Sequence, residues 1–132
     1  MSLADIKADL KAIVAEKSCG PIFIRLSWHD AGVYSTGKLA GGCPNAAMRF
    51  TDAGEGTFGA NAGLPTVALD FLKPITEKYV AAGVISNADL WTLAANVGIE
   101  AMGVSFELLC GEITPETDNS SPSTFCFAPT QM

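Results

Sequence analysis

The sequence predicts an all-α fold of about four helices, followed by an irregular C-terminal tail. Apolar residues recur at helical spacing within four segments, and Gly and Pro residues interrupt that spacing between them. Residues that favour helix starts precede the first and the fourth of these segments. No internal repeat divides the chain, whose 132 residues suffice for one domain with a modest core.

The first helix is expected over residues 3–17 and the second over residues 20–34. Ser2 and Asp5 have the spacing of a capping box at the start of the first. Its apolar positions fall on one helical face: Leu3, Ile6, Leu10, Ile13 and Val14. Gly20-Pro21 ends that pattern and begins the second helix, since Pro is well tolerated in a first turn.

Two further helices are expected over residues 60–79 and 87–102. Asn61 stands at the start of the third helix and Pro74 is expected to kink its last turns. Ser86 precedes the fourth as a cap. Between the second and third helices, residues 35–59 predict a long loop. We therefore divide the chain into a helical domain over residues 1–113 and an extended tail, rich in Ser, Thr and Pro, over residues 114–132.

The amino-acid composition and net charge of the chain limit the kinds of molecule that it is expected to bind. Hydrophobic residues make up 48% of the chain and charged residues 17%, which suggests an apolar surface that meets something other than water. A net charge of −6 argues against nucleic acid and suits a basic protein surface. The longest apolar run, residues 90–99, is bounded by Asp89 and Glu100, so no transmembrane helix is expected.

One face of the second helix carries three side chains that could take part in catalysis. Arg25, Trp28 and His29 stand at i, i+3 and i+4, which places a fixed cation, an aromatic ring and a titratable base side by side. Asn61 is positioned to accept a hydrogen bond from the imidazole, which would fix its tautomer. On spacing alone, an ordinary helix face with a core Trp and a hydrogen-bonded His explains the same pattern, and both interpretations stay open.

Residues 19–34 form a longer motif around this helix face, CGPIFIRLSWHDAGVY. This motif resembles the active-site signature of the class I plant-type haem peroxidases, the ascorbate and cytochrome c peroxidases. The resemblance covers about residues 3–103 in order and at the right spacing. Its other motifs are Gly41-Gly42, Pro44-Asn45, Arg49-Phe50, GANAGL at 59–64, LKPI at 72–75, ADLW at 88–91 and VGIE at 97–100.

The resemblance implies a role for each matching residue. His29 matches the distal base that moves a proton between the two oxygens of hydrogen peroxide, and Arg25 matches the cation that stabilises the leaving oxygen. Trp28 matches the aromatic residue over the haem. Asn61 matches the amide that orients the distal His, and Glu55 matches an acidic residue linked to that network. Lys17 and Cys19 fall where ascorbate-using members have a Lys and a Cys beside the haem edge.

The sequence departs from the family where the iron should be held. Family members are roughly twice as long, and their second half supplies the proximal His, its partner carboxylate and an Arg that helps bind ascorbate. His29 is the sole histidine in the chain, so no second imidazole remains for iron. Where the family has Pro-Gly-Arg, this chain has Cys110-Gly111-Glu112. We therefore expect only the distal half of the fold and no bound cofactor.

Four cysteines are present, none at metal-ligand spacing, and no metal site is expected. Four unpaired thiols are one interpretation. The alternative is a disulfide between Cys110 and Cys126, which would tie the tail to the body with a stabilisation of about 3 kcal/mol. That pairing would favour an oxidising compartment.

Two functional hypotheses follow. The first is a truncated ascorbate-peroxidase-like protein without haem, acting as a structural or binding subunit whose apolar distal face is covered by a protein partner. Its expected location is the chloroplast, with an extrinsic lumenal subunit of a thylakoid photosystem complex as the specific hypothesis. The second is a peroxidase that uses haem b and takes its proximal ligand from a partner chain or a second copy.

Overall fold

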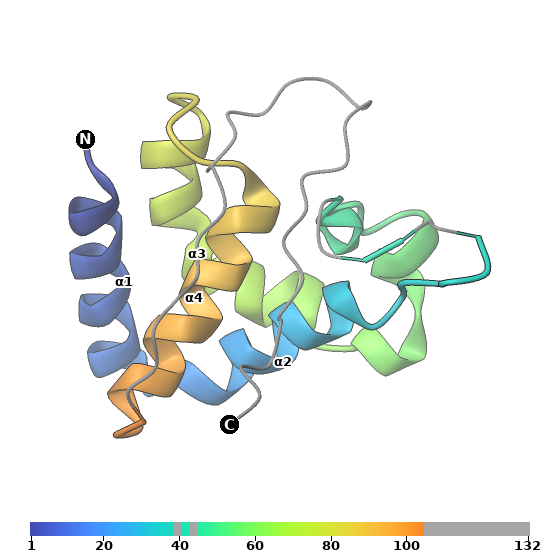
Figure 1. Cartoon of the computed structure of the whole chain (residues 1–132), viewed down its shortest axis with the longest axis horizontal. Coiled ribbons are helices and arrows are strands. Elements are labelled where there is room, and N and C mark those ends of the chain that lie inside the picture. The colour runs from blue at the N-terminus through green and yellow to red at the C-terminus, as the bar shows by residue number, and fades with distance from the viewer. Residues whose placement is uncertain (39–40, 43–44, 105–132) are drawn as a thin grey trace.

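The computed structural model describes residues 1–38, 41–42 and 45–104. These residues form four α-helices and five short helical segments, and contain no β-strand (Figure 1). The predicted all-α architecture of a distal half-domain is therefore confirmed. The tail over residues 114–132 lies outside the described residues, so the predicted domain division stays a prediction. No helix in the described part of the chain is long and apolar enough to cross a membrane.

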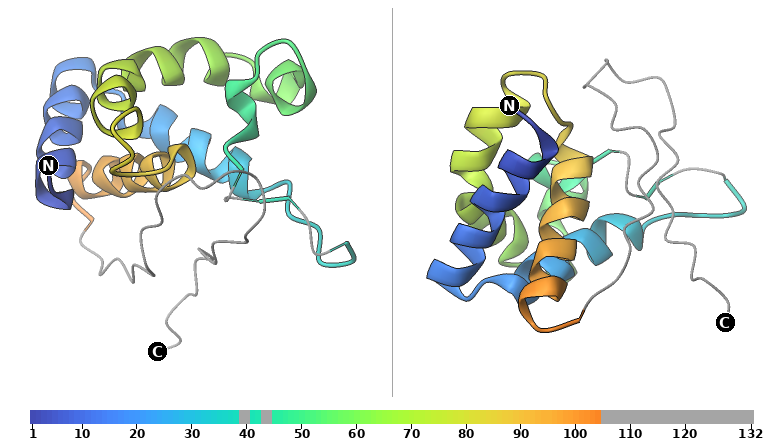
Figure 2. Two further views of the ribbon diagram at one scale, coloured as in Figure 1. Left: turned by 90° about the horizontal axis from the view of Figure 1, so that it is seen from above. Right: turned by 60° about the vertical axis from the view of Figure 1, so that its left-hand side comes forward.

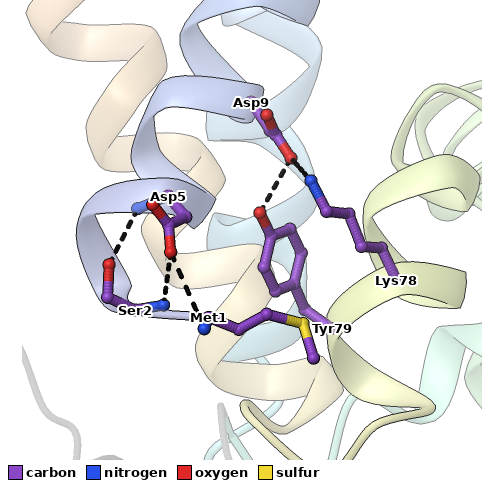
Figure 3. Close-up of polar contacts among 6 residues, drawn as sticks. All are labelled: Met1, Ser2, Asp5, Asp9, Lys78 and Tyr79. Atoms are coloured by element: carbon purple, nitrogen blue, oxygen red, sulfur yellow. Dashed lines mark hydrogen bonds and ion pairs between the residues drawn. The ribbon is translucent and has the colours of Figure 1, made fainter.

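Helix α1 spans Leu3–Lys17, as predicted. Its capping box is complete: Ser2 Oγ accepts from the Asp5 amide at 3.3 Å and the Ser2 amide donates to Asp5 Oδ2 at 2.7 Å (Figure 3). Farther along α1, Asp9 Oδ2 accepts from the Tyr79 hydroxyl at 2.8 Å and from Lys78 Nζ at 2.7 Å. These contacts fasten α1 to the segment that follows α3.

Helix α2 spans Gly20–Ala31 and ends earlier than the predicted residue 34. The Gly32 amide donates to the Trp28 carbonyl oxygen at 2.8 Å, after which the chain leaves the helix in a turn. Pro21 lies in the first turn, as expected. The early end places His29 and Asp30 in the last turn of α2, where the following loop can reach them.

The predicted third helix is divided more finely than expected. Asn61 ends a separate short turn, η3 (Gly59–Asn61), and the helix begins only at Leu64, because Gly63 adopts a left-handed conformation with φ +85°. The continuous helical stretch consists of η4 (Leu64–Ala68), α3 (Leu69–Ile75) and η5 (Thr76–Val80). Both flanking segments have π-helical spacing; the second follows Pro74, which lacks an amide to donate.

Helix α4 spans Asn87–Ala101, one residue short of the prediction, and Ser86 Oγ caps it by accepting from the Asp89 amide at 3.1 Å. It packs against both α1 and α2 (Figures 1 and 2). At the crossing with α2, a Cβ added to Gly98 would lie 2.9 Å from the Gly20 carbonyl oxygen. Two glycines thus let α2 approach α4 closely, which fixes the helix that carries the site.

The predicted long loop over 35–59 contains two short helical turns among its described residues, η1 (Ala47–Arg49) and η2 (Gly54–Thr57). Met48 is buried in the core and anchors this region to the helices. Arg49 in η1 and Glu55 in η2 lie near enough to Asp30, in the last turn of α2, to influence its charge.

Candidate functional site

The structure places Arg25, Trp28 and His29 on consecutive turns of α2 at the predicted spacing. Their exposures differ: Arg25 is exposed, His29 is half-buried and Trp28 is 68% exposed. The indole and imidazole rings meet edge to face, with centroids 5.1 Å apart and an interplanar angle of 70°. A large aromatic ring therefore stands on the surface beside the only imidazole of the chain.

His29 and Asn61 are in direct contact, as predicted from the sequence. His29 Nδ1 lies 2.7 Å from Asn61 Oδ1, and Asn61 is 4% exposed. Asn61 Nδ2 donates to the Glu55 carbonyl oxygen at 2.8 Å. Because a carbonyl oxygen only accepts, this bond fixes the orientation of the amide, and its oxygen faces the imidazole. His29 therefore carries its proton on Nδ1 when neutral and keeps the lone pair of Nε2 available.

Arg25 is held by the backbone that surrounds Asn61. Its Nη2 donates to the Ala60 carbonyl oxygen at 2.7 Å and its Nη1 to the Ala62 carbonyl oxygen at 3.2 Å. A guanidinium stays charged at any physiological pH. The segment 60–62 thus positions both the cation and the imidazole, and the four predicted residues Arg25, Trp28, His29 and Asn61 form one cluster.

A buried acid that was not predicted from the sequence lies next to this cluster. Asp30 follows His29 and is 2% exposed. Its burial, together with the nearby charge of Glu55, raises the pKa of its carboxyl to about 8, against a smaller lowering effect from Arg49. An acidic residue in the last turn of a helix is unfavourable for the helix dipole. That mismatch was the one available signal that Asp30 has a special environment.

Lys17 and Cys19 make their side-chain contacts with residues outside the cluster. Lys17 ends α1, is exposed and pairs with Glu16 at 2.6 Å; hydrogen bonding to Glu16 raises the pKa of the ammonium group. Cys19 is buried, its thiol faces the Ile13 carbonyl oxygen at 3.8 Å, and burial raises the pKa of the thiol. A buried, protonated thiol has low reactivity.

The predicted disulfide partners Cys110 and Cys126 lie outside the described residues, so their pairing stays a prediction. Within the described ranges, no group of three or more His, Cys, Asp or Glu side chains is arranged to hold a metal ion.

The haem implied by the sequence resemblance fits one side of this site. The exposed indole, the anchored guanidinium and the available His29 Nε2 have the chemistry required over a distal haem face. The opposite side needs an imidazole or another strong iron ligand. Because His29 is the sole histidine, using it to ligate iron would remove the base. The residues of this chain therefore fit the distal face of a haem and do not supply its proximal imidazole.

Comparison with known proteins finds peroxidases over the segment that carries this cluster of side chains. The family model described as Peroxidase matches residues 4–125. This chain is 43% identical to a probable peroxisomal L-ascorbate peroxidase 3 of Oryza sativa. The match extends over 97 residues, which are 74% of this chain and 31% of that protein. This chain is also 45% identical to the mitochondrial cytochrome c peroxidase of Aspergillus fumigatus. That match extends over 86 residues, which are 65% of this chain and 22% of that protein.

A putative heme-binding peroxidase of Aspergillus fumigatus is 46% identical over 100 residues, 75% of this chain and 29% of that protein. The chain thus spans less than a third of the length of these relatives. The matched segment contains the whole cluster of Arg25, Trp28, His29 and Asn61. Through this segment, the chain belongs to the class I haem peroxidase family.

Proposed function

We propose that this chain, taken alone, binds no haem at the family's site and reduces no peroxide, and that it acts as a binding subunit of a larger assembly. The observation that carries the proposal is the engagement of the sole histidine. His29 Nδ1 is hydrogen-bonded to Asn61, and only Nε2 is left, so one ring cannot serve as both base and iron ligand.

The surface around Trp28 supports a protein partner. A Trp with 68% of its surface exposed, beside an exposed Arg25, combines two of the three residue types that most often contribute strongly to protein interfaces. The net charge of −6 favours a partner with a basic surface. The partner would cover the indole and leave the hydrogen bonds of His29 and Arg25 in place.

The location is part of this proposal. A chloroplast, and within it the lumenal side of a thylakoid photosystem complex, is suggested by the sequence resemblance to the ascorbate-using branch and by the even number of cysteines. Immunoblotting of fractionated organelles tests it. Recovery with peroxisomes or mitochondria would contradict this part and leave the partner proposal standing.

The catalytic part is tested by steady-state peroxide consumption with excess haem. We expect the wild-type chain to consume hydrogen peroxide no faster than His29→Ala, with both rates equal to that of free haem. Lys73→Ala, at an exposed position of α3, serves as a matched surface control. A wild-type rate that exceeds both free haem and His29→Ala, and that Lys73→Ala retains, would overturn the proposal.

One observation favours a second candidate, a split peroxidase. The His29–Asn61–Glu55 chain of hydrogen bonds, 2.7 and 2.8 Å, holds the imidazole in the tautomer that a distal base requires. A structural subunit does not need this tautomer. In this candidate the proximal ligand comes from another polypeptide or from a second copy.

The chemistry that these residues would perform is proton transfer. His29 Nε2 takes the proton from one peroxide oxygen and returns it to the other, which leaves as water. The Arg25 guanidinium stabilises the negative charge that develops on the departing oxygen. Asn61 holds the imidazole so that Nε2 stays the proton carrier. Haem, when bound, supplies the two electrons that cleavage of the peroxide bond requires.

A haem peptide that carries its own proximal imidazole separates the two candidates. If the split site operates, adding the chain should accelerate peroxide reduction by the peptide on the order of 10²-fold, the usual size of general acid–base catalysis. His29→Ala and Arg25→Ala should abolish the acceleration, and Lys73→Ala should keep it. An absence of acceleration at high chain concentration would contradict the split enzyme.

A further inference from the structure

Two carboxyl oxygens next to the site are buried without a hydrogen-bond partner among the described residues. Asp30 Oδ1 and Glu55 Oε2 both lie out of contact with solvent. A buried, unpartnered carboxylate oxygen is strongly unfavourable, and two in one neighbourhood are worse because like charges repel. The described structure therefore requires a proton or a comparable neutralising group at this place.

The described groups that face Asp30 do not neutralise it. Ala46 donates a backbone hydrogen bond to its carboxyl group, and Arg49 attracts it electrostatically. The Arg49 guanidinium donates instead to the carbonyl oxygens of Asn45 and Ala46, and Asp30 and Arg49 form no ion pair. Glu55 adds repulsion, and the net effect raises the pKa of Asp30 to about 8. The raised pKa favours the protonated form of the Asp30 carboxyl at neutral pH.

The two acids belong to the same chain of contacts as the distal histidine. The Glu55 carbonyl oxygen accepts from Asn61 Nδ2, and Asn61 Oδ1 contacts His29 Nδ1. Asp30 follows His29 on α2. The turn η2, which carries Glu55, is thus linked through Asn61 to the imidazole of His29.

We propose that Asp30, in its neutral form, donates a hydrogen bond to the Glu55 carboxylate, and that this contact positions Asn61 and His29. One proton then satisfies both unpartnered oxygens, since the Asp30 hydroxyl donates and Glu55 accepts. Asp30 and Glu55 are positioning residues, acting on the imidazole through Asn61. The contact exists in the chain without haem, whether or not the assembled site reduces peroxide.

The contact makes the imidazole sensitive to alkaline pH. When Asp30 loses its proton, the hydrogen bond disappears and the two carboxylates repel each other. The turn η2 then moves away from α2 and draws the Glu55 carbonyl oxygen with it, which loosens Asn61. His29 loses its fixed Nδ1 partner as pH rises through the pKa of Asp30, about 8.

Nitrogen NMR of the chain labelled with ¹⁵N-histidine tests this directly, because the sole histidine gives one pair of ring signals. The titration runs from about pH 6 to about pH 10, beyond the ordinary imidazole range. For the wild type we expect a second inflection near pH 8, at which the ring shifts move from the Nδ1–H tautomer towards a tautomer mixture. No haem or peroxide is needed, so the outcome is independent of the proposed function.

Three variants decide the assignment. Asp30→Asn keeps a donor towards Glu55 without a titrating proton, so the Nδ1–H pattern should persist to the highest pH and the second inflection should vanish. Glu55→Gln removes the repulsion, so the inflection should become weaker and move to lower pH. Asp52→Asn, an exposed acid of the same loop, should behave as the wild type. A wild-type curve without the second inflection, or an unchanged inflection in either Asp30→Asn or Glu55→Gln, would overturn the inference.

Discussion

The side chain of His29 reaches Asn61 across 32 positions of sequence, and the sequence alone points to both residues. Helical spacing is enough to place Arg25, Trp28 and His29 together, because i, i+3 and i+4 positions share a face. The contact with Asn61 was predicted from its place near the start of the third helix, and the family resemblance supported it. The burial of Asp30 could not be predicted, because it depends on how the irregular segment 45–57 folds against the end of α2, and no periodicity describes that segment.

Asp30 has a testable effect on stability. Its folded-state pKa of about 8 lies above the unfolded value of 3.8, so between these pH values the folded chain binds more protons than the unfolded chain. The contribution of Asp30 is therefore fully present below about pH 4 and is lost as pH rises through about 8. In Asp30→Asn this loss should be absent.

Chemical denaturation at a series of pH values measures the effect. The free energy of unfolding of Asp30→Asn relative to the wild type should rise by up to about 1.4 kcal/mol per pH unit within that window. Asp52→Asn provides the exposed control and should follow the wild type. Parallel curves for Asp30→Asn and the wild type would mean that the carboxyl group is ionised when folded.

Among the elements, α1 and α4 follow the sequence most closely because their caps, Ser2 and Ser86, are local signals that the structure uses. The third predicted helix was partly wrong. Its start is set by the positive φ of Gly63, and its ends have π-helical spacing, which apolar periodicity does not distinguish from an α-helix. Helix α2 ends early at Gly32, where the sequence alone permitted a further turn.

The crossing of α2 and α4 depends on Gly98. A Cβ there would lie 2.9 Å from the Gly20 carbonyl oxygen and 3.0 Å from the Gly20 Cα, both rigid backbone atoms. Gly98→Ala should therefore destabilise the fold by about 1–2 kcal/mol, although Ala is the better helix former. Gly37→Ala, where a Cβ meets nothing within 4 Å, should be tolerated. Thermal unfolding compares the two; equal stability of Gly98→Ala and the wild type would show that the helices can separate without cost.

At the scale of the whole molecule, the tail and its cysteines carry a separate prediction. We expect Cys110 and Cys126 to form a disulfide, and Cys19, which is buried and unpaired, to stay reduced. Peptide mapping by mass spectrometry under non-reducing conditions measures the pairing. Four thiols that all react with an alkylating agent in the unfolded, unreduced protein would refute the disulfide and remove the argument for an oxidising compartment.

We propose that Arg25, Trp28, His29 and Asn61 form the distal side of a haem site, and that these residues do not supply its proximal side. A family member with both sides binds haem through an imidazole opposite the distal base, whereas this chain has one imidazole, held by Asn61. Its matched segment covers less than a third of the relatives' length. We therefore propose that the site is completed by residues outside this sequence, in another segment or another polypeptide.

A haem titration of the purified chain, followed at the Soret band, tests this claim most directly. We expect no saturable one-to-one shift, and any gradual change should be the same for the wild type and His29→Ala. A saturable, stoichiometric shift in the wild type that His29→Ala loses would mean that the sole imidazole binds iron. A stoichiometric shift that both proteins retain would mean that another side chain supplies the proximal ligand, and either result would contradict the account.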